Sequence, residues 1–188
     1  MPSVARTYRN NLELTYRSDF SREMSKEILD VQAGVVRIHV AGDFYDVGYT
    51  SKWLEIIQAC PDTQFYAYTR SWALEPFVPI LGKMAEQHNM WLWFSCDRAM
   101  PWPPEVPNVR TAYMSVSDDD VPQQRPDLVF RTNRKTPMKW MGNTLVCPVE
   151  QGIKRKAEMT CDRCRICLEA PRASLSRDRS EPQLVQIT

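Results

Sequence analysis

The hydrophobic pattern of the first hundred residues alternates between two periods. Runs of apolar, β-branched and aromatic residues predict short strands, and apolar residues spaced three or four apart predict amphipathic helices. The predicted helices span residues 5–14, 22–29, 51–59 and 76–87, and the predicted strands span residues 35–40, 64–68 and 91–94. Because Pro61 disfavours helical backbone in the residue before it, the third helix should end at Cys60. Strands that alternate with helices predict an α/β fold with a parallel sheet.

The pattern changes after residue 100, where Pro101, Pro103, Pro104 and Pro107 indicate an irregular connection. Short strands are predicted at residues 109–114, 128–131 and 144–147, with gaps too short for full helices. From this pattern we expect three parts: an α/β domain over residues 1–146, a cysteine-rich metal-binding loop over 147–169, and a flexible polar tail over 170–188.

Composition and charge narrow the class of protein. The chain has 188 residues, of which 43% are hydrophobic and 25% charged, values typical of a globular domain. The formal net charge of +1 gives no electrostatic case for a dedicated nucleic-acid binder or an anionic-membrane binder. No apolar run approaches the roughly 20 residues of a membrane helix, and the N-terminus lacks a signal-peptide core. A cytoplasmic protein is therefore expected, with a substrate or partner that the sequence does not identify.

Four cysteines carry the strongest chemical signal in the sequence. Cys161, Cys164 and Cys167 follow one another at two-residue gaps in the run CDRCRIC, and Cys147 stands before a proline. Thiols so closely spaced pair poorly as disulfides, whereas a tight turn can direct all of them to one metal. Bacterial-type iron–sulfur loops use this spacing together with a Cys-Pro pair, while zinc usually takes two separated Cys-x-x-Cys pairs. The four residues therefore predict one metal centre, with a 4Fe–4S cluster favoured and zinc as the alternative.

A second candidate site lies where the predicted strands end. Gly42 and Asp43, then Arg70, then Cys96 each follow one of the first three strands. Ligands of parallel α/β sheets bind at the carboxyl ends of the strands, so these residues are expected to face one cavity. Loops are polar in any case, which explains any single residue equally well.

Other residues carry weaker signals, each with a structural explanation beside the functional one. His39 is either a ligand or proton carrier, or a hydrogen-bonded core histidine. Cys96 is either a reactive thiol or a buried structural one. The run of residues 118–120 is either a divalent-cation site or a solvated loop. The tyrosines and tryptophans between Phe65 and Trp102 are expected to pack in the core rather than to stack on bases.

The segments VRIHVAGDFY, FYAYTRSW, LWFSCDR and LVCPVEQG, with the cysteine run TCDRCRICL, resemble the phage and plasmid gene product 88 family. That family is in turn similar to radical S-adenosylmethionine (SAM) enzymes. The resemblance implies a partial parallel (β/α) barrel in which Ala41-Gly42-Asp43 takes the position of the SAM-binding Gly-Gly-Glu motif. SAM is then a candidate cofactor, held by Gly42 and Asp43 with Arg70 and Cys96 nearby.

The same resemblance implies a limit on activity. Radical SAM enzymes hold their catalytic cluster with three cysteines in a loop before the first helix, and this chain has no cysteine before Cys60. We therefore expect a metal-binding protein related to these enzymes that does not cleave SAM in this form. The alternative is a non-enzymatic, zinc-stabilised binding module of a mobile genetic element, so the sequence leaves open whether the chain is an enzyme.

Overall fold

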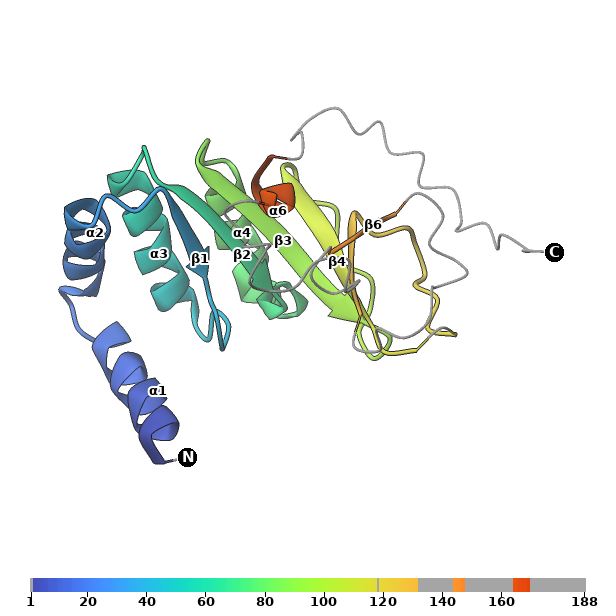
Figure 1. Ribbon diagram of the computed structural model, residues 1–188, viewed down its shortest axis with the longest axis horizontal. Helices are drawn as coiled ribbons and strands as arrows, with labels where there is room; N and C mark the ends of the chain where they lie inside the picture. Colours follow the sequence, from blue (N-terminus) through green and yellow to red (C-terminus); the bar gives the residue numbers. More distant parts are fainter. Residues whose placement is uncertain (1, 118, 132–143, 148–163, 170–188) are drawn as a thin grey trace.

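The computed structural model describes residues 2–117, 119–131, 144–147 and 164–169, and Figure 1 shows the path of the chain. Six parallel strands form one sheet in the order β1-β2-β3-β4-β5-β6, so each strand pairs with the next one in the sequence. The elements in chain order are α1 (Pro2–Thr15), α2 (Phe20–Asp30), β1 (Val35–Ile38), α3 (Val47–Ala59), β2 (Gln64–Thr69), η1 (Ser71–Ala73), η2 (Glu75–Phe77), α4 (Val78–Ala85), β3 (Met90–Asp97), β4 (Val109–Ser115), β5 (Leu128–Arg131), β6 (Leu145–Val146) and α6 (Ile166–Glu169). The α/β class and the parallel sheet predicted from the sequence are confirmed.

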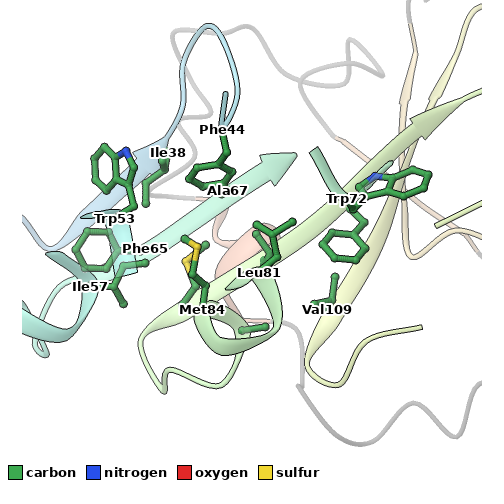
Figure 2. Packing of buried hydrophobic residues seen from close by; sticks show 14 of the residues in the cluster. Ile38, Phe44, Trp53, Ile57, Phe65, Ala67, Trp72, Leu81, Met84 and Val109 are labelled. Carbon is green, nitrogen blue, oxygen red and sulfur yellow. The ribbon is translucent and has the colours of Figure 1, made fainter. Parts of the chain in front are cut away.

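Helices α3 and α4 cover one face of the sheet, which we call the helix face. Side chains alternate between the two faces of a strand, and those of Phe65, Leu92, Phe94 and Val129 belong to the large core cluster under these helices. Figure 2 shows Leu81 of α4 packed within this cluster, near the strand residues. A parallel strand is normally covered on both faces, which explains why every residue of β2 to β5 is buried or half-buried.

The opposite face of the sheet, which we call the α6 face, carries a smaller cluster. It is built from Trp93, Ala112 and Leu128, with the partly buried Tyr68 and Phe130 packed against them. Ile166 and Cys167 belong to the same cluster, and α6 contacts β2, almost a hundred residues earlier in the chain. Figure 1 shows α6 beside the middle strands, whereas α1 projects away from the sheet. The second face of the sheet is therefore covered in part by the cysteine-rich segment.

Several predicted boundaries differ from the structure; the strand predicted over 35–40, for example, ends at Ile38, and the helix predicted over 76–87 spans Val78–Ala85. Two of the differences have an identifiable physical reason. Helix α3 begins at Val47 rather than residue 51, because the Asp46 carboxylate accepts a hydrogen bond of 2.7 Å from Tyr49 N and caps the helix earlier. Strand β3 continues to Asp97, because its last residues pair with β4, Cys96 opposite Tyr113. Cys96 is thus a strand residue rather than part of the loop after the strand.

The predicted tail over 170–188 lies outside the described residues, and so does Cys161. Among the helices that the structure describes, none has the length and apolar character needed to cross a bilayer.

Candidate functional site

The cysteine segment is attached to the α6 face by three side-chain hydrogen bonds to two strands, β2 and β3. The Tyr68 hydroxyl donates to Cys167 Sγ at 2.8 Å, and the Trp93 indole N–H donates to the Cys167 carbonyl oxygen at 3.2 Å. Two residues before Cys167, Arg165 Nη2 donates to Gln64 Oε1 at 2.7 Å. Sulfur and backbone of Cys167 are therefore both held, which fixes the direction of this side chain relative to the sheet.

Cys147 approaches the same region from β6. Its backbone N–H donates to the Val129 carbonyl oxygen at 3.1 Å, which continues the parallel pairing past Val146. The pKa of Tyr68 is raised well above its usual value, first by burial, then by Cys167, and also by Cys147. The Tyr68 hydroxyl is therefore within electrostatic range of two cysteines that are twenty residues apart in the sequence.

The structure does not assemble the predicted four-cysteine centre within its described part. Cys147, Cys164 and Cys167 are half-buried, and Cys161 is not among the described residues. In the residues that are described, no group of three or more His, Cys, Asp or Glu side chains is arranged to hold a metal ion. The chemistry of the donor set nevertheless fits a thiophilic metal, because all four predicted ligands are cysteines.

At the carboxyl edge of the sheet, the Asp43 carboxylate is fully engaged in the fold. Its Oδ1 accepts hydrogen bonds from Thr69 Oγ1 at 2.6 Å and Phe44 N at 2.8 Å, and its Oδ2 accepts one from Arg70 N at 2.7 Å. These bonds tie the turn after β1 to the end of β2. The hydrogen bond from Thr69 could not be predicted from the sequence, because it joins residues 26 positions apart.

Gly42 and Arg70 lie at the same edge as Asp43. Gly42 has a φ of +88°, which favours glycine, and a Cβ built there would meet no atom within 4 Å. The Arg70 side chain forms an ion pair with Asp97 at 2.7 Å. The edge therefore brings Gly42, Asp43 and Arg70 together, with an accessible stretch of backbone at Gly42.

Cys96 does not share the environment of these three residues. Its side chain belongs to the core cluster of the helix face and is 1% exposed. Burial, and secondarily the Asp97 carboxylate, raise the pKa of Cys96 to about 12, so the thiol stays protonated at neutral pH. Cys60 is also buried in that core, where its sulfur donates to the Ser25 carbonyl oxygen at 3.8 Å. Both residues have the environment of structural thiols.

His39 lies in a cluster of aromatic rings next to β1. Its ring is stacked on Tyr49 with 5.6 Å between centroids and meets Phe44 and Trp53 edge-on. His39 Nε2 and the Tyr49 hydroxyl are 2.8 Å apart, while Nδ1 is buried without a hydrogen-bond partner in the part of the chain described. Burial lowers the pKa of His39, and the more distant Asp43 opposes this shift. The core interpretation of this histidine fits these contacts.

The buried position of Asp120 contradicts the solvated-loop interpretation for this residue of the acidic run 118–120. Asp120 is fully buried, and its carboxylate accepts hydrogen bonds from the Tyr113 hydroxyl at 2.6 Å and from Val116 N at 2.9 Å. This carboxylate holds the turn after β4 against the end of that strand. The sequence alone could not reveal this role, because a run of consecutive aspartates looks the same whether its members are solvated or buried.

A surface depression of about 450 Å³ lies between α2 and α3. It is lined by both signs of charge, including Arg22, Lys26, Asp30 and Glu55. None of its lining residues belongs to either candidate site.

Taken together, the fold and the candidate sites define an α/β protein with one all-parallel sheet and a cysteine segment packed on its second face. The chain belongs to the Gene product 88 family, whose family model matches residues 1–170. That match covers the sheet and all six cysteines. Comparison with curated proteins gave no match, and neither did comparison with solved structures.

Asp43→Asn should lower the free energy of unfolding by about 1–3 kcal/mol, because the new amide nitrogen cannot accept a hydrogen bond from the groups that face it. Urea unfolding followed by circular dichroism measures the change. Asp62→Asn is the matched control, since Asp62 is exposed, and it should change stability by less than about 0.5 kcal/mol. Equal stability of the two variants would contradict a structural role for Asp43.

The lowered pKa of His39 predicts a pH-dependent stability. In the range between the folded and unfolded pKa values the unfolded chain binds more protons, so stability decreases as the pH falls below about 6.5. The free energy of unfolding should therefore fall more steeply toward low pH in the wild type than in His39→Gln. His88→Gln, which leaves His39 in place, should keep the wild-type slope. A His39→Gln slope equal to that of the wild type would count against the burial of this imidazole.

Proposed function

We propose that this protein carries a metal centre formed by Cys147, Cys161, Cys164 and Cys167 and seated against the α6 face of the sheet. The observation that supports this proposal is that Cys167 Sγ accepts a hydrogen bond from Tyr68 of β2, while Cys147 continues the pairing of β6 with β5 in the same sheet. Cys164 lies three residues before Cys167 in the segment that Arg165 ties to β2. Two separate segments of the chain, the end of β6 and the segment around α6, thus supply three of the four proposed ligands.

A 4Fe–4S cluster is the favoured occupant of this centre, and zinc is the alternative. Four cysteines satisfy either one, but overlapping two-residue gaps are the spacing of iron–sulfur loops. Half-buried thiols beside aromatic rings also give the partly dry surroundings that protect a cluster from solvent. Thiols of this kind stay reduced in the cytoplasm, which is the compartment we propose for the protein.

A relationship to radical SAM proteins is part of this proposal. The consecutive order of parallel strands is the order a partial (β/α) barrel requires, and the carboxyl edge holds Gly42 with open space around its backbone. SAM is the candidate ligand of Gly42, Asp43 and Arg70. The proposal does not extend to Cys96, because its thiol is buried on the helix face.

SAM cleavage is not part of the function that we propose for these 188 residues. Four of the six cysteines belong to the proposed centre, where they would fill all the ligand positions of one cluster. The remaining two, Cys60 and Cys96, are 0% and 1% exposed in the core and cannot bind a second one. The second candidate is a non-enzymatic, zinc-stabilised binding module of a mobile genetic element, in which Asp43, already the acceptor of three hydrogen bonds within the fold, would have a structural role.

The metal is tested by anaerobic purification, followed by elemental analysis and visible absorption. Iron and acid-labile sulfide with a broad charge-transfer band are expected. Cys164→Ser should lose the metal and unfold at lower urea concentration, because binding of a structural metal is coupled to folding. Cys60→Ala is the matched control and should retain the metal, since Cys60 lies in the core. Zinc alone would exclude the cluster and keep the four-ligand centre, and no metal in any preparation would refute both.

The activity is tested with the reduced, iron-loaded protein and SAM, with formation of 5′-deoxyadenosine as the readout. We expect no product above the level of an oxidised control, because no described cysteine outside the centre can hold an iron with an open position. Stoichiometric product would refute this expectation. It would also mean that one iron of the cysteine centre is accessible to SAM.

A further inference from the structure

Tyr68 is one of the most firmly positioned side chains on the α6 face. Its ring lies 5.6 Å from the ring of Trp93 and meets Phe130 edge-on at 5.2 Å. Tyr66, two residues earlier on the same strand, meets it edge-on at 6.2 Å. Trp93 is itself held, with the Arg110 guanidinium 4.9 Å from the centre of its ring. Because its ring is enclosed by rings from β2, β3 and β5, the Tyr68 hydroxyl has a nearly fixed position.

That hydroxyl is directed at the sulfur of a predicted metal ligand. The O···S distance of 2.8 Å marks a hydrogen bond in which Tyr68 donates to Cys167 Sγ. A thiolate has three lone pairs, so one pair that accepts from a fixed donor determines where the other two point. The second bond, from Trp93 to the Cys167 carbonyl oxygen, prevents the backbone from turning the sulfur away.

We infer that Tyr68 is a positioning residue of the metal centre, whose hydroxyl orients and stabilises the Cys167 thiolate as a ligand. The inference rests on the metal centre proposed above, and it adds a residue that belongs to no cysteine motif. Hydrogen bonds to ligating sulfurs stabilise charge on the sulfur and tune the electronic properties of the metal. A structural tyrosine that only packed against α6 would leave those properties unchanged.

The test is the absorption spectrum of the full chain loaded with Co²⁺, which reports thiolate ligation through sulfur-to-metal charge-transfer bands. Tyr68→Phe removes the hydroxyl and keeps the ring. Its bands should move to longer wavelength, because a sulfur without this hydrogen bond gives up electron density more easily. Its affinity for Co²⁺ should fall by about 10- to 100-fold, the usual effect of losing a partner of a ligand.

Tyr113→Phe is the matched control, because the Tyr113 hydroxyl donates to Asp120, which follows β4 and is not a proposed metal ligand. It loses the same kind of buried hydrogen bond and should keep the wild-type bands. Bands and affinity unchanged in Tyr68→Phe would overturn the inference while leaving the metal centre intact. A wild-type protein without thiolate bands would instead refute the centre itself, and the inference with it.

A second measurement covers the case in which Tyr68→Phe does not fold. In the wild-type protein loaded with isotopically labelled cadmium, the hydroxyl proton of Tyr68 should show a scalar coupling to the metal through the sulfur. A protected hydroxyl proton without this coupling would contradict the inference.

Discussion

A parallel sheet has to be covered on both faces, and the rest of this structure depends on that constraint. Helices α3 and α4 satisfy it on one side through a continuous core that includes Phe65, Leu81 and Leu92. On the other side the described cover is a single helical turn, α6, held by Tyr68 and Trp93. The cysteine segment is therefore part of the packing of the sheet rather than an appendage to it, and any metal bound there would act on the stability of the whole domain.

At the carboxyl edge of the sheet, two acidic side chains hold the turns that follow the strands. Asp43 joins the turn after β1 to β2, and Asp120 joins the turn after β4 to β4 itself. Both carboxylates accept hydrogen bonds from backbone N–H groups at the ends of the strands and in the turns that follow them. Acidic residues at the ends of parallel strands are thus not by themselves evidence for a ligand site, and here the open backbone at Gly42 is the stronger indication.

Much of the fold could be predicted from the sequence, because it depends on local patterns. Apolar runs predict the strands β2 and β5, and the proline after Cys60 predicts the end of α3. In each case the residues that decide the structure are close together in the sequence. What could not be predicted depends on distant partners. The length of β3 is set by its pairing with β4, and the side on which Cys96 lies follows from that register. The contact between Tyr68 and Cys167 spans 99 positions, and no feature of either segment indicates it.

This long-range contact also explains why a metal centre and the sheet would depend on each other. Closing a chain segment onto a distant strand costs conformational entropy, and a four-residue helix buries too little apolar surface to offset much of that cost. Under the proposed centre, Cys147 at the end of β6 and Cys164 and Cys167 around α6 would share one metal, which ties the last strand to the segment that covers β2 and β3. The metal would then replace the missing apolar area with ligand bonds, and α6 would hold its place over Trp93 for as long as the thiolates remain bound.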